Sequence, residues 1–434
     1  MAMLERYFNL KENGTDVKTE VLAGITTFMT MAYILIVNPV MLNEAGMNFG
    51  GVFTATALSA VIATLVMALY AKYPFALAPG MGLNAFFAYS VVLGMGKSWQ
   101  FALTAVLIEG IIFVLLSLVN AREAIFNAIP KSLKNAVSVG IGLFIAFIGL
   151  SGAGIVVSDP ETMVTLGNLT EGPALLAIIG ILVTGFLVAK DVKGAILIGI
   201  IATTVIGFPL GVTSFPDAVV SLPPSLKDVA FQFVGWNEIF SKEMAFVVFT
   251  FLFVDVFDTV GTLAGVAAKA DMLDEDGKLP NVGKALMADA VGTISGACLG
   301  TSTVTTFVES ASGVAEGGRT GLTALTTAGM FFIALFFAPL FIMVPSAATT
   351  PALVIVGLFM MSSIVDIDFT DYTESIPAFL TIVMMPFAYS IAEGIAFGMV
   401  SYVVLKAVTG KFKDISIIMW LLGGVFVLRA IFLI

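Results

Sequence analysis

The sequence predicts an all-α polytopic membrane protein. Of its 434 residues, 59% are hydrophobic and only 12% are charged, whereas soluble domains carry roughly 25% charged residues. The mean hydropathy is +1.05, and the apolar residues gather in long runs rather than in the ~10-residue alternating segments of a membrane β-barrel. Both observations indicate many transmembrane helices.

Fourteen apolar spans can be placed along the chain, seven before and seven after a polar, proline-containing stretch at 213–242. Several are shorter than the ~20 residues that a straight helical crossing needs, so we expect some spans to be broken or re-entrant. The predicted spans are 20–42, 50–71, 74–95, 99–119, 133–151, 172–189 and 194–212, followed by 243–270, 283–298, 300–315, 320–343, 346–364, 375–390 and 391–408.

The basic residues between the spans predict the orientation of the chain. Most lie on one side, and mainly Lys97, Lys227 and Lys242 lie on the other. Because cytoplasmic loops are enriched in Lys and Arg, we expect a cytoplasmic N-terminal segment at 1–19 and a location in the inner (cytoplasmic) membrane. The acidic loop at 366–374 is expected to be a solvated turn. The apolar helix at 414–433 is expected to lie on, or dip into, the cytoplasmic face.

Two successive sets of seven spans start from opposite sides of the membrane, because seven is odd. This predicts an inverted-topology repeat, which is common in secondary transporters. The third and tenth spans then correspond, and both are interrupted, by FALAPGMGLNAFFAY at 75–89 and GTSTVTTFVESASGVAEGGR at 300–319. Paired interrupted spans indicate a ligand site near the middle of the membrane.

The tenth span carries Glu309, an ionisable side chain at the predicted depth of the membrane. A carboxylate there costs at least ~2.5 kcal/mol, so it indicates a function. The residues before it are mostly β-branched, which favours extended backbone, whereas a helix can restart at Ser310. Extended backbone is tolerated at this depth only where protein buries it or where it lines a cavity, so we expect a ligand site at the break.

Three more polar side chains stand in apolar spans. Asn84 lies at the third-span break, and Asp255 and Asp258 lie in the eighth span. Asp255 and Asp258 share a helix face, because they are three residues apart. Clustered carboxylates can hold a proton in one access state and release it in another, which proton coupling requires.

The same groups predict the kind of ligand. Carboxylates repel anions, and a carboxylate can accept two parallel N–H bonds, while Asn offers both a donor and an acceptor. Aromatic side chains next to these positions, Phe28, Phe86 and Phe307, can stack on a ring. The expected ligand is therefore a flat, neutral heterocycle that bears N–H groups.

Structural roles remain open for these residues. Asp255 can cap a broken backbone, and Asn84 can join two helices. Asp258 or Glu309 can pair with a basic residue at a helix end. Glu109 stands in an apolar span without a partner nearby in sequence, so structural and gating roles are both open.

The composition also excludes several classes of protein. There is no histidine and only one cysteine, Cys298, which excludes a disulfide framework and a His- or Cys-built metal site. The DEDG run at 274–277 lacks the rest of a calcium loop. The chain shows no nucleophile elbow and no repeated filter motif, which disfavours an enzyme and a channel. We expect a transporter with no metal, no cofactor and no nucleic-acid partner.

Four stretches of the chain resemble the xanthine/uracil permease family of nucleobase–cation symporters, and more narrowly its azaguanine-type branch, which carries guanine, hypoxanthine and adenine. The combination is specific, and the general pattern covers nearly the whole chain. The stretches are AGITTFMTMAYILIVNP at 23–39, APGMGLNAFFAY at 78–89, FVDVFDTVGTLAG at 253–265 and GTSTVTTFVESASGVAEGGRTGLTA at 300–324.

This resemblance implies the uracil-permease fold, which has fourteen membrane segments in a seven-plus-seven inverted repeat. Short antiparallel strands would meet in the third and tenth segments. The resemblance implies a core domain at 20–120 and 243–344, a gate domain at 121–242 and 345–409, and a C-terminal helix at 410–434. Substrate would bind beside the strands, between the two domains. Homodimers through the gate domain occur in this fold.

The resemblance also implies roles for individual residues. Glu309 matches the glutamate that grips the base, and Asp258 matches a position that is Glu in uracil permeases, so the shorter Asp leaves room for a two-ring base. Phe307 matches an aromatic residue that contacts the ring. Thr27 stands where some relatives carry a histidine, whose role does not transfer. The residues expected to bind substrate are Glu309, Asp258, Asn84, Phe307, Thr27, Phe28 and Ser310. Those expected to couple the proton or hold the site's geometry are Asp255, Asp258 and Glu309.

The expected function is proton-coupled uptake of a purine nucleobase by alternating access. One alternative is a uracil or xanthine permease of the same fold, which Asp258 and the PGMGLN stretch disfavour. The other is an anion transporter of the same fold, which would be expected to carry a basic residue or an empty dipole pocket in place of Glu309.

Overall fold

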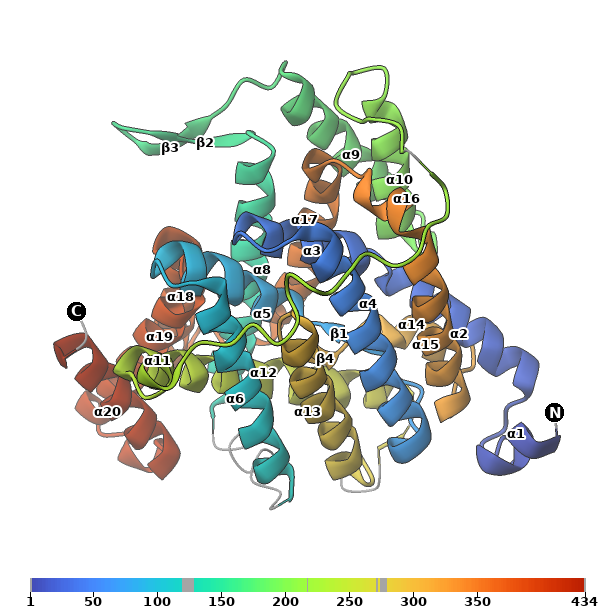
Figure 1. The fold of residues 1–434 in the computed structure, drawn as a ribbon. Coiled ribbons are helices and arrows are strands. Elements are labelled where there is room, and N and C mark those ends of the chain that lie inside the picture. The colour runs from blue at the N-terminus through green and yellow to red at the C-terminus, as the bar shows by residue number, and fades with distance from the viewer. Residues whose placement is uncertain (1, 119–128, 217, 271, 274–278, 433–434) are drawn as a thin grey trace.

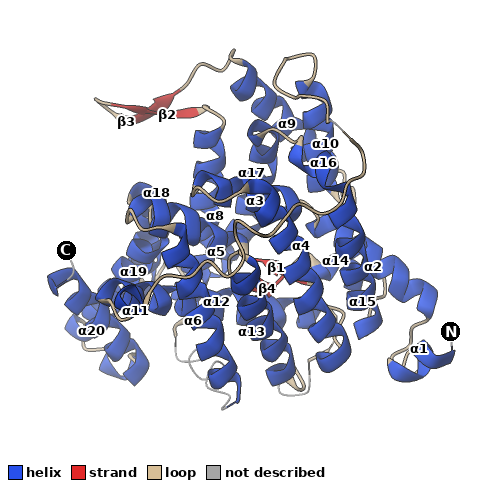
Figure 2. Ribbon diagram, viewed as in Figure 1, coloured by secondary structure: helices blue, strands red, loops and turns tan. Residues whose placement is uncertain are grey.

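A computed structural model describes residues 2–118, 129–216, 218–270, 272–273 and 279–432 (Figure 1). The DEDG run at 274–277 lies outside the described residues. Helices dominate, and the few strands are short (Figure 2). The principal helices are α1 (Ala2–Tyr7), α2 (Val17–Met31), α3 (Ile34–Glu44), α4 (Phe49–Val66), α5 (Met81–Ala85), α6 (Trp99–Leu118), α8 (Lys131–Gly152), α9 (Gly172–Ala189), α10 (Ala195–Gly207), α11 (Trp236–Ile239), α12 (Lys242–Lys269), α13 (Val282–Leu299), α14 (Ser310–Ala315), α15 (Gly321–Ala334), α16 (Ala338–Ile342), α17 (Ser346–Met361), α18 (Tyr372–Phe387), α19 (Ile391–Val408) and α20 (Ile417–Phe432).

The predicted fold class is confirmed. Each predicted span coincides with a helix or with a strand followed by a helix. Within the described residues, ten helices are long and apolar enough to cross a membrane. Some spans are composite: α4 continues into the π-helical η1 (Met67–Ala71), and α5 continues into η2 (Phe86–Gly94).

The two interrupted spans meet through a pair of very short strands. Strand β1 (Leu77–Pro79) pairs antiparallel with β4 (Val304–Thr306), so that Ala78 lies opposite Thr305. Strand residues Val304, Thr305 and Thr306 are β-branched, which suits extended backbone. All of the strand residues are buried, so protein encloses the extended backbone as membrane depth requires. Helices α5 and α14 restart directly after their strands.

The first predicted span is also broken. Helix α2 ends at Met31, and α3 begins at Ile34 after the Ala32–Tyr33 junction. At the other end of α2, the buried Glu20 carboxylate accepts hydrogen bonds from the backbone of Arg319, at 2.8 Å, and of Thr323, at 3.0 Å. Glu20 thereby satisfies amide donors around the start of α15, which favour a negative charge.

The helices pack in two groups (Figure 1). In one, α13 packs against α4 and α6, and α15 packs against α2 and α4; in the other, α8 lies along α17 and α18, and α9 along α10 and α17. Small residues allow close approach in the second group. A Cβ added at Gly142 of α8 would come within 2.5 Å of the Gly357 carbonyl of α17. Side chains there cannot grow without separating the helices.

Two connections differ from simple loops. A hairpin of β2 (Val156–Asp159) and β3 (Met163–Leu166) follows α8, which no pattern in the sequence predicts, and Figure 1 shows it extending away from the helices. The polar stretch at 213–242 runs across other elements. Within it, the Phe231 amide donates to the Cys298 carbonyl at 2.9 Å.

The acidic loop at 366–374 is more than a solvated turn. Glu374 pairs at 2.6 Å with Lys406, whose side chain is only 3% exposed. Lys411 donates to Asp371 at 2.9 Å, and this hydrogen bond holds the pKa of Asp371 well below its usual range. These contacts tie α18 to the end of α19. Helix α20 then packs on α19, and its Phe426 ring lies 5.7 Å from Phe249 of α12.

Candidate functional site

Glu309 occupies the turn between β4 and α14. The residue is partly exposed, and its Oε1 accepts a hydrogen bond of 2.7 Å from the Tyr33 hydroxyl. The neighbouring Ser310 is buried, and its Oγ accepts from the Ala76 amide at 3.0 Å. Ser310 therefore anchors the start of α14 to the third span, and Glu309 projects from this anchored turn.

Asp258 approaches the same strands from the middle of α12. Its Oδ2 accepts from Thr305 Oγ1 at 3.0 Å, and the side chain is partly exposed. A Cβ added at Gly80, directly after β1, would lie 3.1 Å from that oxygen. Both interrupted spans and α12 thus converge, and the two predicted carboxylates, Glu309 and Asp258, both lie beside the β1–β4 pair.

Asp255 lies deeper than Asp258. It is fully buried, and its Oδ1 accepts from Thr259 Oγ1 at 2.8 Å. The same hydroxyl lies 3.0 Å from Oδ2 of Asp289 on α13, which is also fully buried. One hydroxyl has a single proton and cannot donate fully to two carboxylates. The Thr259 hydroxyl therefore bridges the two buried carboxylates.

Asn84 ties the two interrupted spans together. Its Oδ1 accepts a hydrogen bond from Ser302 Oγ, and its Nδ2 donates to the Pro79 carbonyl at 3.4 Å. Thr303, which follows Ser302 in the sequence, donates through Oγ1 to the buried Glu109 of α6 at 2.6 Å. Both ends of the Asn84 amide are therefore engaged within the fold, and Glu109 supports the extended segment before β4.

The remaining predicted residues lie around Glu309 at different depths. Phe307 is 5% exposed, and its ring centroid lies 6.4 Å from that of Tyr33. Phe28 packs edge-on against Phe331 of α15, with the centroids 5.1 Å apart. Thr27 of α2 is buried against α14, where a Cβ added at Gly313 would collide with the Thr27 Oγ1. Thr27 thus faces a helix contact rather than an opening.

Three residues at the site were not predicted from the sequence. Tyr33 binds Glu309, Thr305 binds Asp258, and Asp289 joins the Asp255 cluster. Thr305 belongs to the threonine-rich run already singled out, and Asp289 is an acidic residue in an apolar span, so each carried a signal. Tyr33 stands in an ordinary apolar run with no such signal. No group of three or more metal-ligating side chains occurs in the described parts of the chain.

Burial changes along α12 on either side of Asp258. Gly261 and Gly265, one and two turns towards the C-terminal end of the helix, are exposed. Phe251 and Val254, on the N-terminal side of Asp258, are buried. Val308, beside Glu309, is 51% exposed.

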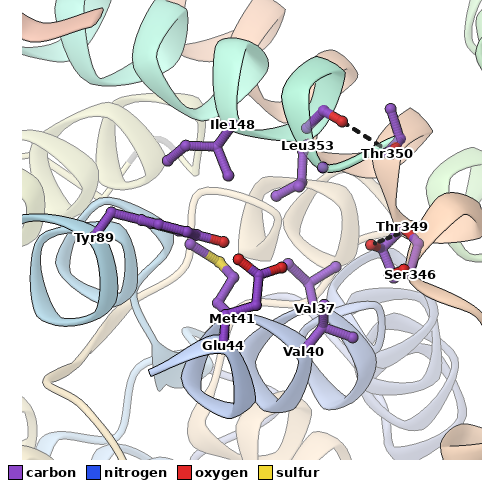
Figure 3. A pocket seen from close by; sticks show the side chains of 12 residues that line it. Val37, Val40, Met41, Glu44, Tyr89, Ile148, Ser346, Thr349, Thr350 and Leu353 are labelled. Carbon is purple, nitrogen blue, oxygen red and sulfur yellow. Dashed lines mark hydrogen bonds between the residues drawn. The ribbon is translucent and has the colours of Figure 1, made fainter. Parts of the chain in front are cut away.

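Two cavities lie away from these carboxylates. A small one, of about 20 Å³, is bounded by α3, α8 and α17, and Glu44 and Tyr89 point into it (Figure 3). It has room for about one water molecule. A second, of about 240 Å³, lies between η2 and the α18–α19 turn and is lined in part by Tyr389 and Ser390. Both follow the seam between the two helix groups.

We expect that Gly80→Ala will lower uptake while the protein still reaches the membrane. The added Cβ would lie 3.0 Å from Thr305 Oγ1 and 3.1 Å from Asp258 Oδ2, so the hydroxyl or the carboxylate must shift. The shift needed is a few tenths of an ångström. Because a misplacement of about 1 Å can cost about 10²-fold in activity, the loss should stay below that factor. Uptake of a radiolabelled substrate, normalised to the amount of protein in the membrane, tests this. The matched control is Gly152→Ala at the end of α8, where nothing lies within 4 Å of the added Cβ; equal activity of the two variants would contradict the expectation.

Comparison with known proteins gives matches over nearly the whole chain. Residues 18–397 match a family described as the Permease family, that of the xanthine/uracil permeases. The chain is 53% identical over 433 residues to a putative permease of Methanocaldococcus jannaschii, covering 100% of this chain and 99% of that protein. It is 48% identical over 440 residues to the guanine/hypoxanthine permease PbuG of Bacillus subtilis, with coverages of 99% and 100%. It is 44% identical over 434 residues to the adenine permease AdeP of Escherichia coli, with coverages of 99% and 96%.

Two solved structures share the fold at low sequence identity. The transmembrane domain of the cyanobacterial bicarbonate transporter BicA has a TM-score of 0.65 and 17% identity, with 89% of this chain and 97% of that chain covered. SLC26A9 has a TM-score of 0.63 and 11% identity, with 94% and 69% covered. Both likenesses concern the fold alone.

Proposed function

Because this chain belongs to the xanthine/uracil permease family, we propose that it imports the purine nucleobases guanine, hypoxanthine and adenine by proton symport. The observation that carries the proposal is the meeting of Glu309 and Asp258 at the β1–β4 pair. Relatives that match nearly the whole chain are permeases named for adenine and for guanine and hypoxanthine. The protein is a membrane transporter and not an enzyme.

In the proposed binding mode, a purine lies beside the strands. Glu309 accepts N–H groups of the base, and Asp258 binds the base or carries the coupling proton. Asp255 holds the geometry or shares that proton through Thr259, which contacts it at 2.8 Å. Carboxylate acceptors suit the N–H edges of a purine, and the buried Phe307 ring offers an apolar surface near the base.

We propose that transport proceeds by alternating access between two groups of packed helices. We propose that the group containing α2–α6 and α12–α15 is the core domain, and that the group containing α8–α10 and α17–α19 is the gate domain. The core would move as one body, carrying the site past the gate. The carboxylates Glu309 and Asp258 would then face alternately one side of the membrane and the other.

The setting of the protein is part of the proposal. We place it in the inner membrane with a cytoplasmic N-terminus, because most basic loop residues lie on that side. A homodimer through the gate domain would cover apolar side chains that α9 and α10 expose, including Leu182 (68% exposed), Phe186 (62%) and Ile201 (52%). Lipid can cover the same surface in a monomer.

The alternatives differ at the site. A uracil or xanthine permease would bind a different base in the same place. An anion transporter, as BicA is named, shares the fold. Glu309 and Asp258 disfavour an anion, because neither carboxylate has a basic partner among its described hydrogen bonds.

A ligand panel on purified protein tests the proposed function. A ligand that binds the folded state raises the melting temperature by mass action. We expect adenine, guanine or hypoxanthine to stabilise the protein, and xanthine, uracil and sulfate to have little effect. Stabilisation by uracil or xanthine alone would indicate that the protein is a uracil or xanthine permease of the same fold. A response to sulfate alone would overturn the role of Glu309.

A further inference from the structure

Tyr33 links the first span to the carboxylate at the tenth-span break. Its Oη donates to Glu309 Oε1 at 2.7 Å, and its side chain is 1% exposed. The residue stands where α2 gives way to α3, and its carbonyl accepts from the amides of Ile36 and Val37. The hydroxyl therefore comes from a buried ring at an ordered helix start. A hydrogen bond to an ionised carboxylate is about twice as strong as a neutral one.

The first span also holds the backbone of Glu309. Thr30, three residues before Tyr33, places Oγ1 3.5 Å from the Glu309 carbonyl. Helix α14, which follows Glu309, packs on α2 where Gly313 meets Thr27. The position of the carboxylate thus depends on α2 and Tyr33 as well as on its own strand.

The charges around Glu309 show what the hydroxyl opposes. A charge on Asp258 of α12 repels a charge on Glu309, and a charge on Asp289 of α13 repels one on Asp258. Strand β1 contributes only Leu, Ala and Pro. Like charges in a site of low dielectric favour protonation of one carboxylate, whereas a hydrogen bond from an O–H donor favours the ionised form. Tyr33 supplies such an O–H donor to Glu309.

We propose that Tyr33 is a positioning residue for substrate binding, which aims the Glu309 carboxylate and favours its ionised form so that Oε2 accepts an N–H group of the base. This role rests on the proposed purine transport. Tyr33 itself need not touch the substrate. Loss of its hydroxyl makes protonation of Glu309 easier, so binding is lost at a higher pH.

Binding measured against pH in Tyr33→Phe tests the proposal. Hypoxanthine, guanine and adenine are titrated into wild type and variant by calorimetry, from about pH 5.5 to about pH 8. We expect the variant to bind about tenfold more weakly at the acidic end and to approach wild type at the alkaline end, because its pH midpoint moves up by about one unit. Tyr372→Phe, at a side chain that is 73% exposed, is the matched control and should follow the wild-type curve.

The outcomes separate this proposal from the proposed function. If wild type binds no purine, the proposed function fails. If wild type binds and Tyr33→Phe shows the wild-type curve, the positioning role is overturned. An equal loss at every pH overturns the proposed effect of Tyr33 on the ionisation of Glu309. Should the variant be too unstable to purify, infrared difference spectra of wild type against Glu309→Gln decide. An ionised Glu309 near pH 7 supports the role, and a protonated one overturns it.

Discussion

Glu309→Gln is expected to abolish purine uptake while leaving the protein in the membrane. The amide is nearly the same size as the carboxylate, so the turn between β4 and α14 and its Ser310 anchor should persist. The amide carries no charge, however, and replaces one acceptor oxygen by a donor nitrogen that faces the N–H edge of the base. When a site is built to hydrogen-bond a ligand, leaving its buried polar groups unpaired can lower the preference for that ligand by about 10⁴-fold.

Uptake of radiolabelled adenine, guanine and hypoxanthine, normalised to the protein in the membrane, checks this expectation. Glu238→Gln provides the matched control, because Glu238 is exposed on the short helix α11. That control should transport as wild type does. Uptake at the wild-type rate in Glu309→Gln would show that Glu309 does not bind the substrate.

Asp258→Glu is expected to lower purine uptake by at least about tenfold. The extra methylene must fit between Thr305 Oγ1, which lies 3.0 Å from the carboxylate, and the backbone at Gly80. It would push the carboxylate into the space that a two-ring base needs. One misplaced methylene in a binding pocket costs about 10–200-fold in discrimination. A one-ring pyrimidine needs less room, so the ratio of uracil to purine binding should rise.

Competition of unlabelled uracil against labelled hypoxanthine measures this ratio. The matched control is Asp228→Glu in the exposed part of the 213–242 stretch, where an added methylene meets solvent. An unchanged ratio in Asp258→Glu, with uptake preserved, would show that the length of this side chain does not set the room for the base.

The positions of the spans were predictable from local composition. Apolar runs, basic loops and the odd number of spans in each half depend on neighbouring residues or on simple counting, and the helices of the structure follow them. The break at Glu309 was predictable for the same reason, because the threonine-rich run before it disfavours a helix. The pairing of β1 with β4 came only from the family resemblance, since periodicity does not choose a partner for three extended residues.

The contacts that complete the site were decided by the tertiary structure. Tyr33 meets Glu309 across 276 positions of sequence, and Asn84 reaches Ser302 across 218. The sequence by itself determined which residues are charged at membrane depth and where the chain cannot remain helical, since both depend on side-chain chemistry. Which hydroxyl donates to which carboxylate depends on how the broken first, third and tenth spans pack together, because a hydrogen bond forms only at about 2.5–3.2 Å.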